Sequence, residues 1–182
     1  MQSSNKISEL IKSDLLRYGI KPSFLNICKE LIFGNHSFKF SFWMRMCAGK
    51  NIFFLFSKAM YSYYRNKYGL QIPYSTQIGY GLYLGHGINI VVSDSAEIGN
   101  NCNLSHSCTI GSNFNNAAKI GNCVYIGPNS CIIENVIIGN NVTIGAGSVV
   151  VKDVPNDATV AGVPTKVINY NRPGRFINNP YL

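Results

Sequence analysis

Residues 120–150 read IGNCVYIGPNSCIIENVIIGNNVTIGAGSVV, and an aliphatic residue stands at every sixth position of this stretch. The positions are Ile120, Ile126, Ile132, Ile138, Ile144 and Val150. An α-helix repeats about every 3.6 residues and a β-strand about every two, so neither produces this pattern. A short, fixed period indicates a solenoid, in which each unit stacks on its neighbours.

The same period extends upstream to Ile72, with two interruptions. The phase slips by two residues between Ile90 and Val92, and four residues are inserted after Gly111. Six residues suffice for one short strand and a corner, and three units close a coil of about 18 residues. We expect the aliphatic side chains to point inward and to stack about 4.8 Å apart, with Gly and Asn at corners that need positive φ. Strands of a β-sandwich recur roughly every 8–12 residues without a fixed phase, so the sequence predicts an all-β solenoid instead.

The first 70 residues differ from the rest of the chain in charge and pattern. They hold eleven Lys and Arg residues against three acidic residues, whereas the remainder holds five of each. Apolar residues at helical spacing predict helical segments from Ile7 to Leu15, from Pro22 to Phe33 and from Phe38 to Tyr68. We therefore expect a basic α-helical N-terminal module over 1–70, the solenoid domain over 71–168 and a C-terminal tail over 169–182.

Two interpretations of the basic, aromatic-rich module stay open on the sequence. Its helices can cover the open end of the solenoid, where an unpaired coil edge needs protection, or they can lie on an anionic membrane surface. No apolar run approaches the ~18 residues that span a bilayer, and no motif supports nucleic-acid binding. Six scattered Cys residues and no secretory pattern over Met1–Ser13 favour a reducing cytoplasm. We expect a cytoplasmic protein, with peripheral association at the membrane face left open.

Two of the three His residues fall at equivalent positions of the repeat. His86 and His106 each follow an inward-pointing Leu by two residues, and one coil of about 18 residues plus the two-residue slip separates them. We therefore expect them at one corner on adjacent rungs, with Pro128 and Ala146 continuing the column. Residues 112–119 are expected to form a loop beside this column. The residues alone predict a cleft that contains an imidazole.

Two stretches of the repeat resemble a known family. Residues 83–92 (YLGHGINIVV) resemble the active-site stretch of the hexapeptide-repeat acyltransferases, in particular their serine acetyltransferase branch. Residues 144–168, which begin IGAGSVV and end AGVPTKVI, are similar to that family's C-terminal signature. The resemblance covers about residues 71–168. It implies a left-handed parallel β-helix that forms a homotrimer, with acyl-CoA bound between adjacent subunits.

The resemblance also implies the chemistry of the site. His86 matches the family's catalytic His, which takes the proton of the acceptor hydroxyl and later protonates the CoA thiolate. A backbone N–H near Gly111 and Ser112 is expected to stabilise the oxyanion. The co-substrate is expected to be acetyl-CoA, and no metal is expected. The residues expected to bind CoA are Gly111, Ser112, Pro128, Ala146, Gly147, Ser148, Lys152 and Lys166.

Different parts of CoA are expected to meet different members of this set. The pantetheine arm would run along the column past Pro128 and Ala146, and its amides would pair with the exposed backbone of the coil corners. Lys166, with Lys152 as the second choice, would meet the phosphates as a point charge. A solvated surface charge is the alternative for either Lys.

Four positions depart from the serine acetyltransferase pattern. Gly85 stands where the family has an Asp before the catalytic His, and Gln71 matches the Asp that orients that His. Asn116 and Ala117 stand where the family has an Arg-His pair. Loss of a cationic clamp for a carboxylate removes a contact worth about 1.5–3 kcal/mol. The sequence therefore favours a sugar hydroxyl as the acceptor, in surface-polysaccharide biosynthesis, with serine O-acetylation in cysteine biosynthesis as the alternative.

The group that orients His86 stays open among a backbone carbonyl, Asp94 and His106. Two other functions are less favoured. A metal-dependent carbonic anhydrase on the same solenoid needs three converging His ligands, and only His86 and His106 lie in the repeat. A non-catalytic scaffold would need no reactive imidazole at all.

Overall fold

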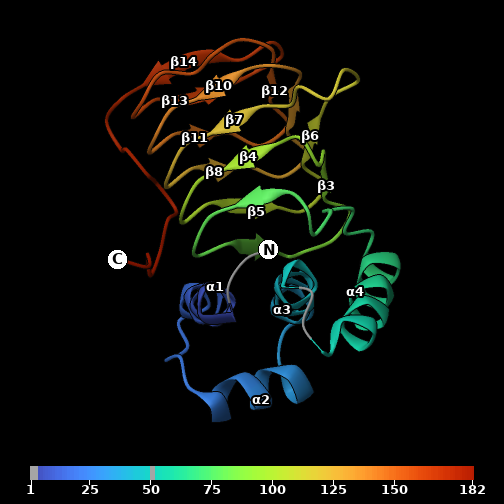
Figure 1. Ribbon diagram of the computed structural model, residues 1–182. Helices are drawn as coiled ribbons and strands as arrows, with labels where there is room; N and C mark the ends of the chain where they lie inside the picture. Colours follow the sequence, from blue (N-terminus) through green and yellow to red (C-terminus); the bar gives the residue numbers. More distant parts are fainter. Residues whose placement is uncertain (1–3, 50–51) are drawn as a thin grey trace.

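The six-residue period folds into a left-handed parallel β-helix whose short strands form three sheets, as Figure 1 shows. The computed structural model describes residues 4–49 and 52–182. One sheet contains β1 (Gln77–Ile78), β4 (Glu97–Ile98), β7 (Lys119–Ile120) and β10 (Ile137–Ile138). The second contains β2 (Tyr83–Gly85), β5 (Asn103–Ser105), β8 (Tyr125–Ile126), β11 (Thr143–Ile144), β13 (Thr159–Ala161) and β14 (Lys166–Asn169). The third contains β3 (Val91–Val92), β6 (Thr109–Gly111), β9 (Cys131–Ile133) and β12 (Val149–Val150).

The strand register confirms the inward aliphatic column. Leu84 pairs with Leu104, which in turn pairs with Ile126, and all three side chains are buried. The same holds for the other inward positions that the period marks from Ile72 to Val150. The aliphatic interior continues into the helices, because Phe40 and Tyr61 belong to the same core. The solenoid and the helical module therefore share one hydrophobic interior.

The register also shows where the two-residue slip falls. Gly85 pairs with Ser105, but Val91 pairs with Thr109. The corner that begins at His86 is therefore two residues longer than the corner above it. The four inserted residues lie between β6 and β7, as the sequence predicts. The extra length in the lower corner means that its backbone groups cannot all pair with the next rung.

The glycines that follow the inward residues are needed for a different reason from the one predicted. Their φ angles are ordinary, and positive φ falls instead on corner residues such as Asn101 and Asn141. A Cβ atom at Gly99 would lie 2.6 Å from the carbonyl oxygen of Gly121 on the next rung. Close stacking of the corners, rather than backbone twist, therefore excludes a side chain at these positions.

Four helices precede the solenoid within the described residues: α1 (Ser4–Arg17), α2 (Phe24–Phe33), α3 (His36–Ala48) and α4 (Phe54–Tyr68). The segment from Phe38 to Tyr68, predicted as one stretch, is two helices, with α3 capped by Gly49. Figure 1 shows α1 and α3 directly below the first coil, and α2 on their far side. None of the described helices is long and apolar enough to cross a lipid bilayer.

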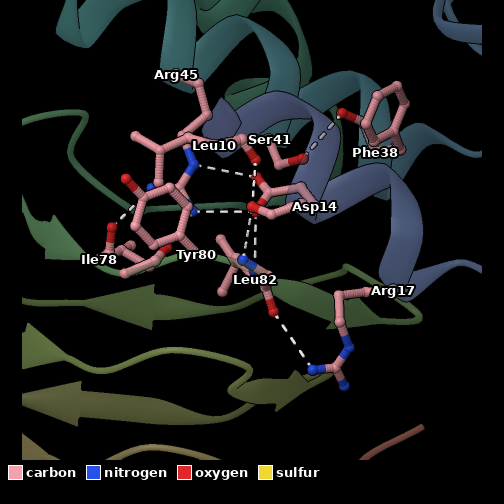
Figure 2. A network of polar contacts seen from close by, with 12 residues as sticks. Leu10, Asp14, Arg17, Phe38, Ser41, Arg45, Ile78, Tyr80 and Leu82 are labelled. Carbon is pink, nitrogen blue, oxygen red and sulfur yellow. Dashed lines mark hydrogen bonds and ion pairs between the residues drawn. The ribbon is translucent and has the colours of Figure 1, made fainter. Parts of the chain in front are cut away.

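A buried polar network joins the helices to the edge of the first coil (Figure 2). Arg45 of α3 donates to both carboxylate oxygens of Asp14 in α1, at 3.0 and 3.1 Å. Arg45 also donates to the carbonyls of Ile78 and Gly79, and the Leu82 N–H donates to Asp14. Exposed coil-edge groups would otherwise lack partners, so these side chains replace the missing rung. The module therefore caps the solenoid.

Candidate active site

His86 stands at the corner that follows β2, with its side chain exposed. Its φ of 53° is in the left-handed region, as it is at other corner residues such as Ser107 and Asn129. His106 follows β5 on the next rung, and the two ring centroids lie 5.9 Å apart at an interplanar angle of 75°. The sequence prediction that the two His residues share a corner on adjacent rungs agrees with this geometry.

The long corner at His86 is held from below by the helical module. The Gly87 N–H donates to the Ser37 hydroxyl at 3.1 Å, and the Asn89 N–H donates to the Tyr68 carbonyl at 2.8 Å. His36 Nε2 lies 3.1 Å from the Gly87 carbonyl oxygen. A carbonyl can only accept, so Nε2 carries the proton and donates it. The corner is thus tied to the start of α3 and to the end of α4.

The imidazole of His36 is held by ring stacking as well as by its hydrogen bond to Gly87. It stacks on the Tyr68 ring, with centroids 4.1 Å apart and planes within 15°. Burial lowers the pKa of His36 below its usual value, against a smaller opposing effect of the hydrogen bond to Gly87. The neutral Nε2–H tautomer satisfies the contact to Gly87. Sequence reasoning missed His36 and Ser37, because their role depends on a contact about fifty residues away in the chain.

A pocket of about 220 Å³ opens beside His86 on the outer face of β2, β5 and β8. Its lining consists of Tyr83, Gly85, His86, Asn103, Ser105, Tyr125 and Phe176. Tyr83 and Tyr125 occupy equivalent outward positions of the repeat, so the register could have indicated them. A larger groove of about 670 Å³ follows the sheet of β1, β4, β7 and β10, and no His lines it.

The C-terminal tail forms one wall of the pocket beside His86. The Phe176 ring lies 4.8 Å from the Tyr125 ring, and the Asn103 side chain donates to the Phe176 carbonyl at 2.9 Å. Further along, Tyr181 exchanges two hydrogen bonds with Asn101. Figure 1 shows this segment descending along the solenoid towards α1. Sequence reasoning did not assign the tail to the site, because it has no period that could be matched to a rung.

Two residues were predicted to support His86. Asp94 is exposed in the turn after β3, and no hydrogen bond or ion pair links it to His86 among the described residues. His106 does face His86, as the ring geometry shows. Its Nδ1 atom is buried and has no hydrogen-bond partner within residues 4–49 and 52–182. The structure thus places His106, and not Asp94, against the imidazole.

The residues predicted near the oxyanion lie at the base of an ordered loop. Gly111 ends β6, and the Ser112 hydroxyl donates to Glu134 at 3.1 Å. The Ser112 oxygen in turn accepts the N–H groups of Phe114 and Asn116. Glu134 also accepts from the Asn113 N–H. The loop therefore has a fixed shape that Glu134 and the Ser112 hydroxyl maintain.

The column above His86 continues as the register requires. The Asn129 N–H donates to the His106 carbonyl, and the Gly147 N–H donates to the Pro128 carbonyl. Ala146 and Gly147 are exposed at the next corner, with Gly147 at a φ of 66°. Ser148 differs from the others, because its side chain is fully buried and its hydroxyl donates to the Gly145 carbonyl. Ser148 therefore supports the corner and does not present its hydroxyl to a ligand.

The two predicted phosphate-binding cations lie at the C-terminal end of the solenoid. Lys152 follows β12, and Lys166 begins β14. Both side chains are exposed, and neither forms an ion pair in the part of the chain that the structure describes. Both charges are thus available to an anionic ligand at that end.

Comparison with known proteins agrees with this fold. Residues 117–152 match the family model described as bacterial transferase hexapeptide (six repeats). No match was found among curated protein sequences. Serine acetyltransferase from Neisseria gonorrhoeae is 31% identical and covers 92% of this chain and 68% of its own, with a TM-score of 0.75. The soybean serine acetyltransferase apoenzyme is 26% identical over 91% of this chain and 70% of its own, with a TM-score of 0.75.

A third solved structure is that of serine acetyltransferase from Brucella abortus in complex with coenzyme A. It is 26% identical to this chain, covers 91% of it and 68% of its own length, and gives a TM-score of 0.72. These likenesses define an acyltransferase built on a hexapeptide-repeat solenoid. The chain belongs to the hexapeptide-repeat acyltransferases, in their serine acetyltransferase-like branch.

Proposed function

We propose that this chain transfers an acetyl group from acetyl-CoA to a hydroxyl oxygen, with His86 as the general base and L-serine as the acceptor. The observation that carries the proposal is the exposed imidazole of His86, at a fixed corner of a chain 31% identical to a serine acetyltransferase. A second Neisseria gonorrhoeae structure, 32% identical, contains serine. These relatives favour serine over the sugar acceptor that the sequence alone favours.

The chemistry follows from an imidazole beside an open pocket. His86 accepts the proton of the acceptor hydroxyl while that oxygen attacks the thioester carbonyl. The tetrahedral intermediate then collapses, the carbon–sulfur bond breaks, and the imidazolium returns the proton to the CoA thiolate. The acyl group passes directly from CoA to the acceptor while His86 carries the proton, so no acyl-enzyme is formed. The His106 ring lies 5.9 Å from the His86 ring, centroid to centroid, on the next rung.

Acetyl-CoA is proposed to lie along the column that starts at His86, in the cleft between neighbouring subunits of a homotrimer. The exposed corner at Ala146 and Gly147 would face its pantetheine arm. Lys166 and Lys152 lie at the C-terminal end of the solenoid, where unpaired positive charge would meet the phosphates. Sedimentation velocity of the purified chain tests the trimer, and a monomer that is fully active would contradict the shared cleft.

A sugar hydroxyl is the second candidate acceptor, and one observation favours it. The loop over residues 112–118 contains no Lys, Arg or His, and the Lys119 ammonium at its end pairs with Glu97 at 3.1 Å. A carboxylate acceptor would therefore find no cation on this loop. A neutral hydroxyl compound needs none.

Release of CoA from acetyl-CoA separates the two acceptors. We expect turnover with L-serine, and turnover only with neutral sugars would replace serine by the second candidate. His86→Ala should lower the rate about 10²–10⁴-fold with either acceptor, because the general base is removed. His86 is exposed, so the His86→Ala variant should fold normally, and an unchanged unfolding temperature would verify this. A variant with undiminished turnover would contradict the catalytic role.

A further inference from the structure

The helical module exposes a large apolar surface at the end of the molecule farthest from β14. We define the α2 face as the exposed apolar residues of α2 and of the start of α4, together with Ile52 just before α4: Phe24, Leu25, Ile32, Phe33, Ile52, Leu55 and Phe56. Ile52 is 92% exposed and Phe24 is 85% exposed. No residue of α2 is fully buried. Phe24 and Ile52 line one groove, so the two sides of this face meet there, and an exposed apolar surface of this kind marks an interaction site.

This surface is not used by the cap. The contacts that close the solenoid come from α1, from α3 and from the later turns of α4, where the Tyr61 hydroxyl donates to the Ile72 carbonyl. Figure 1 shows α2 on the opposite side of α1 and α3 from the coil. An apolar groove of about 520 Å³ lies between α2, α1 and α3, and Phe24 and Ile52 are among the residues that line it. The fold therefore leaves both the groove and the outer side of α2 open.

Positive charge is mixed into the α2 face. Lys29 is exposed on α2, four residues after Leu25 and three before Ile32, so it lies on the same side of the helix. The Lys39 ammonium donates to the Ile32 carbonyl at 3.0 Å, at the C-terminal end of α2. Lys58 is exposed one turn beyond Leu55 on α4. Glu30 is the only acidic residue of α2.

The buried ion pair accounts for little of the module's charge. Asp14 and Arg45 neutralise each other, and Arg17 is also buried. Residues 1–70 hold eleven basic and three acidic residues, so most of the excess stays on the surface of the module. The α2 face is therefore an apolar patch in a strongly positive surrounding.

We propose that the α2 face docks on the surface of an anionic lipid bilayer. Phe24, Leu25, Ile32 and Phe33 would enter the boundary between headgroups and acyl chains, and Lys29 and Lys58 would pair with lipid phosphates. Two observations disfavour a second copy of this chain as the partner. Two copies would bring like positive charge together, and Lys is depleted in protein–protein interfaces. Docking is independent of the proposed acetyl transfer, because it needs neither substrate nor His86.

Co-sedimentation of the full chain with vesicles tests the proposal. We expect binding to vesicles of phosphatidylcholine with phosphatidylglycerol, little binding to phosphatidylcholine alone, and a decline of binding with added salt. The variant Leu25→Ser/Ile32→Ser/Phe33→Ser should reduce the partition coefficient on the order of 100-fold, since three exposed apolar side chains no longer insert. These residues are exposed, so the fold should be retained.

Matched controls separate specific docking from general effects. Ile137→Ser/Ile168→Ser removes exposed apolar residues from the solenoid and should leave binding unchanged. Lys29→Glu should lower binding about tenfold, whereas Arg172→Glu, with the same change of charge on an exposed tail residue, should have a smaller effect.

The proposal would be overturned if the chain did not bind the anionic vesicles, or if Ile137→Ser/Ile168→Ser lost as much vesicle binding as the α2 variant. It would also be overturned if the chain bound no vesicles but self-associated with rising concentration, and the α2 variant abolished that self-association. The last result would assign the face to a second copy. Because vesicle binding is measured without turnover, an inactive chain that binds would overturn only the proposed function.

Discussion

The hydrogen bond between Ser37 and Gly87 gives the sharpest test of how the helical module controls the active site. Ser37 is fully buried, and its hydroxyl oxygen lies 3.1 Å from the Gly87 nitrogen. Gly87 is buried too, so its N–H is shielded from bulk water in Ser37→Ala. A buried N–H without a partner costs about 1–3 kcal/mol. We expect the free energy needed to open the corner to fall by this amount. The Gly87 amide hydrogen should then exchange with solvent roughly 5- to 150-fold faster.

The same substitution should lower turnover without abolishing substrate binding. His86 is the neighbour of Gly87, so a looser corner misplaces the imidazole. A displacement near 1 Å costs on the order of 100-fold in rate. We expect kcat in the CoA-release assay to fall about 10- to 100-fold, with KM for acetyl-CoA changed by less than about twofold, because the expected CoA contacts lie on higher rungs.

Ser57→Ala is the matched control for this test. Ser57 is also a fully buried serine on a helix, but its hydroxyl has no hydrogen-bond partner among the described residues. Its loss should leave kcat and Gly87 exchange unchanged, and it should not reduce stability. If Ser37→Ala and Ser57→Ala gave the same kcat and the same exchange rate, the reasoning that the module positions His86 would be refuted.

Three further predictions concern stability and reactivity. Asp14→Asn should lower the free energy of unfolding by about 3–5 kcal/mol in chemical denaturation, because the Arg45 guanidinium then stays buried without its anionic partner; a loss below about 1 kcal/mol would contradict the network. His36 has a lowered pKa in the folded state, so its contribution to stability is present above about pH 6.5 and is lost as pH falls through the folded pKa. Between pH 7.5 and 5.5, the wild type should therefore lose more stability than His36→Gln, and equal losses would contradict this sign. Burial raises thiol pKa to about 11 or 12 at three cysteines, so Ellman's reagent should modify at most three of the six thiols in the native protein and all six after unfolding; the three protected ones are Cys47, Cys102 and Cys108.

The repeat was predictable because each rung obeys the same local rule. An inward aliphatic residue every six positions fixes the coil, so counting residues from Leu84 to Leu104 suffices to bring His86 and His106 together. The prediction that the glycines after the inward residues serve positive φ was wrong, because it considered only the backbone of one rung. The clash that a Cβ at Gly99 would make with the Gly121 carbonyl involves two rungs and appears only when they are stacked.

Contacts made by residues outside the six-residue repeat could not be derived from the sequence. Ser37 and Gly87 are fifty residues apart, and nothing in the helical pattern of α3 indicates that its first turn meets a solenoid corner. The same applies to Phe176, which reaches Tyr125 through an irregular tail. The boundary near residue 70, drawn from charge, separated two parts that meet at the site.

The longer corner at His86 explains why the helical module must contact the solenoid there. Its two additional residues leave the Gly87 and Asn89 backbone groups unable to follow the ladder, and both His86 and Asn89 adopt a φ of 53°. Positive φ at residues other than Gly is unfavourable and persists where surrounding contacts enforce it. Positive φ also occurs at corners of higher rungs, such as Ser107 and Asn129. What sets this corner apart is that Ser37, His36 and Tyr68 pair with its backbone groups. The helices thus hold the corner that presents the imidazole, so the helical module supports the proposed active site as well as capping the solenoid.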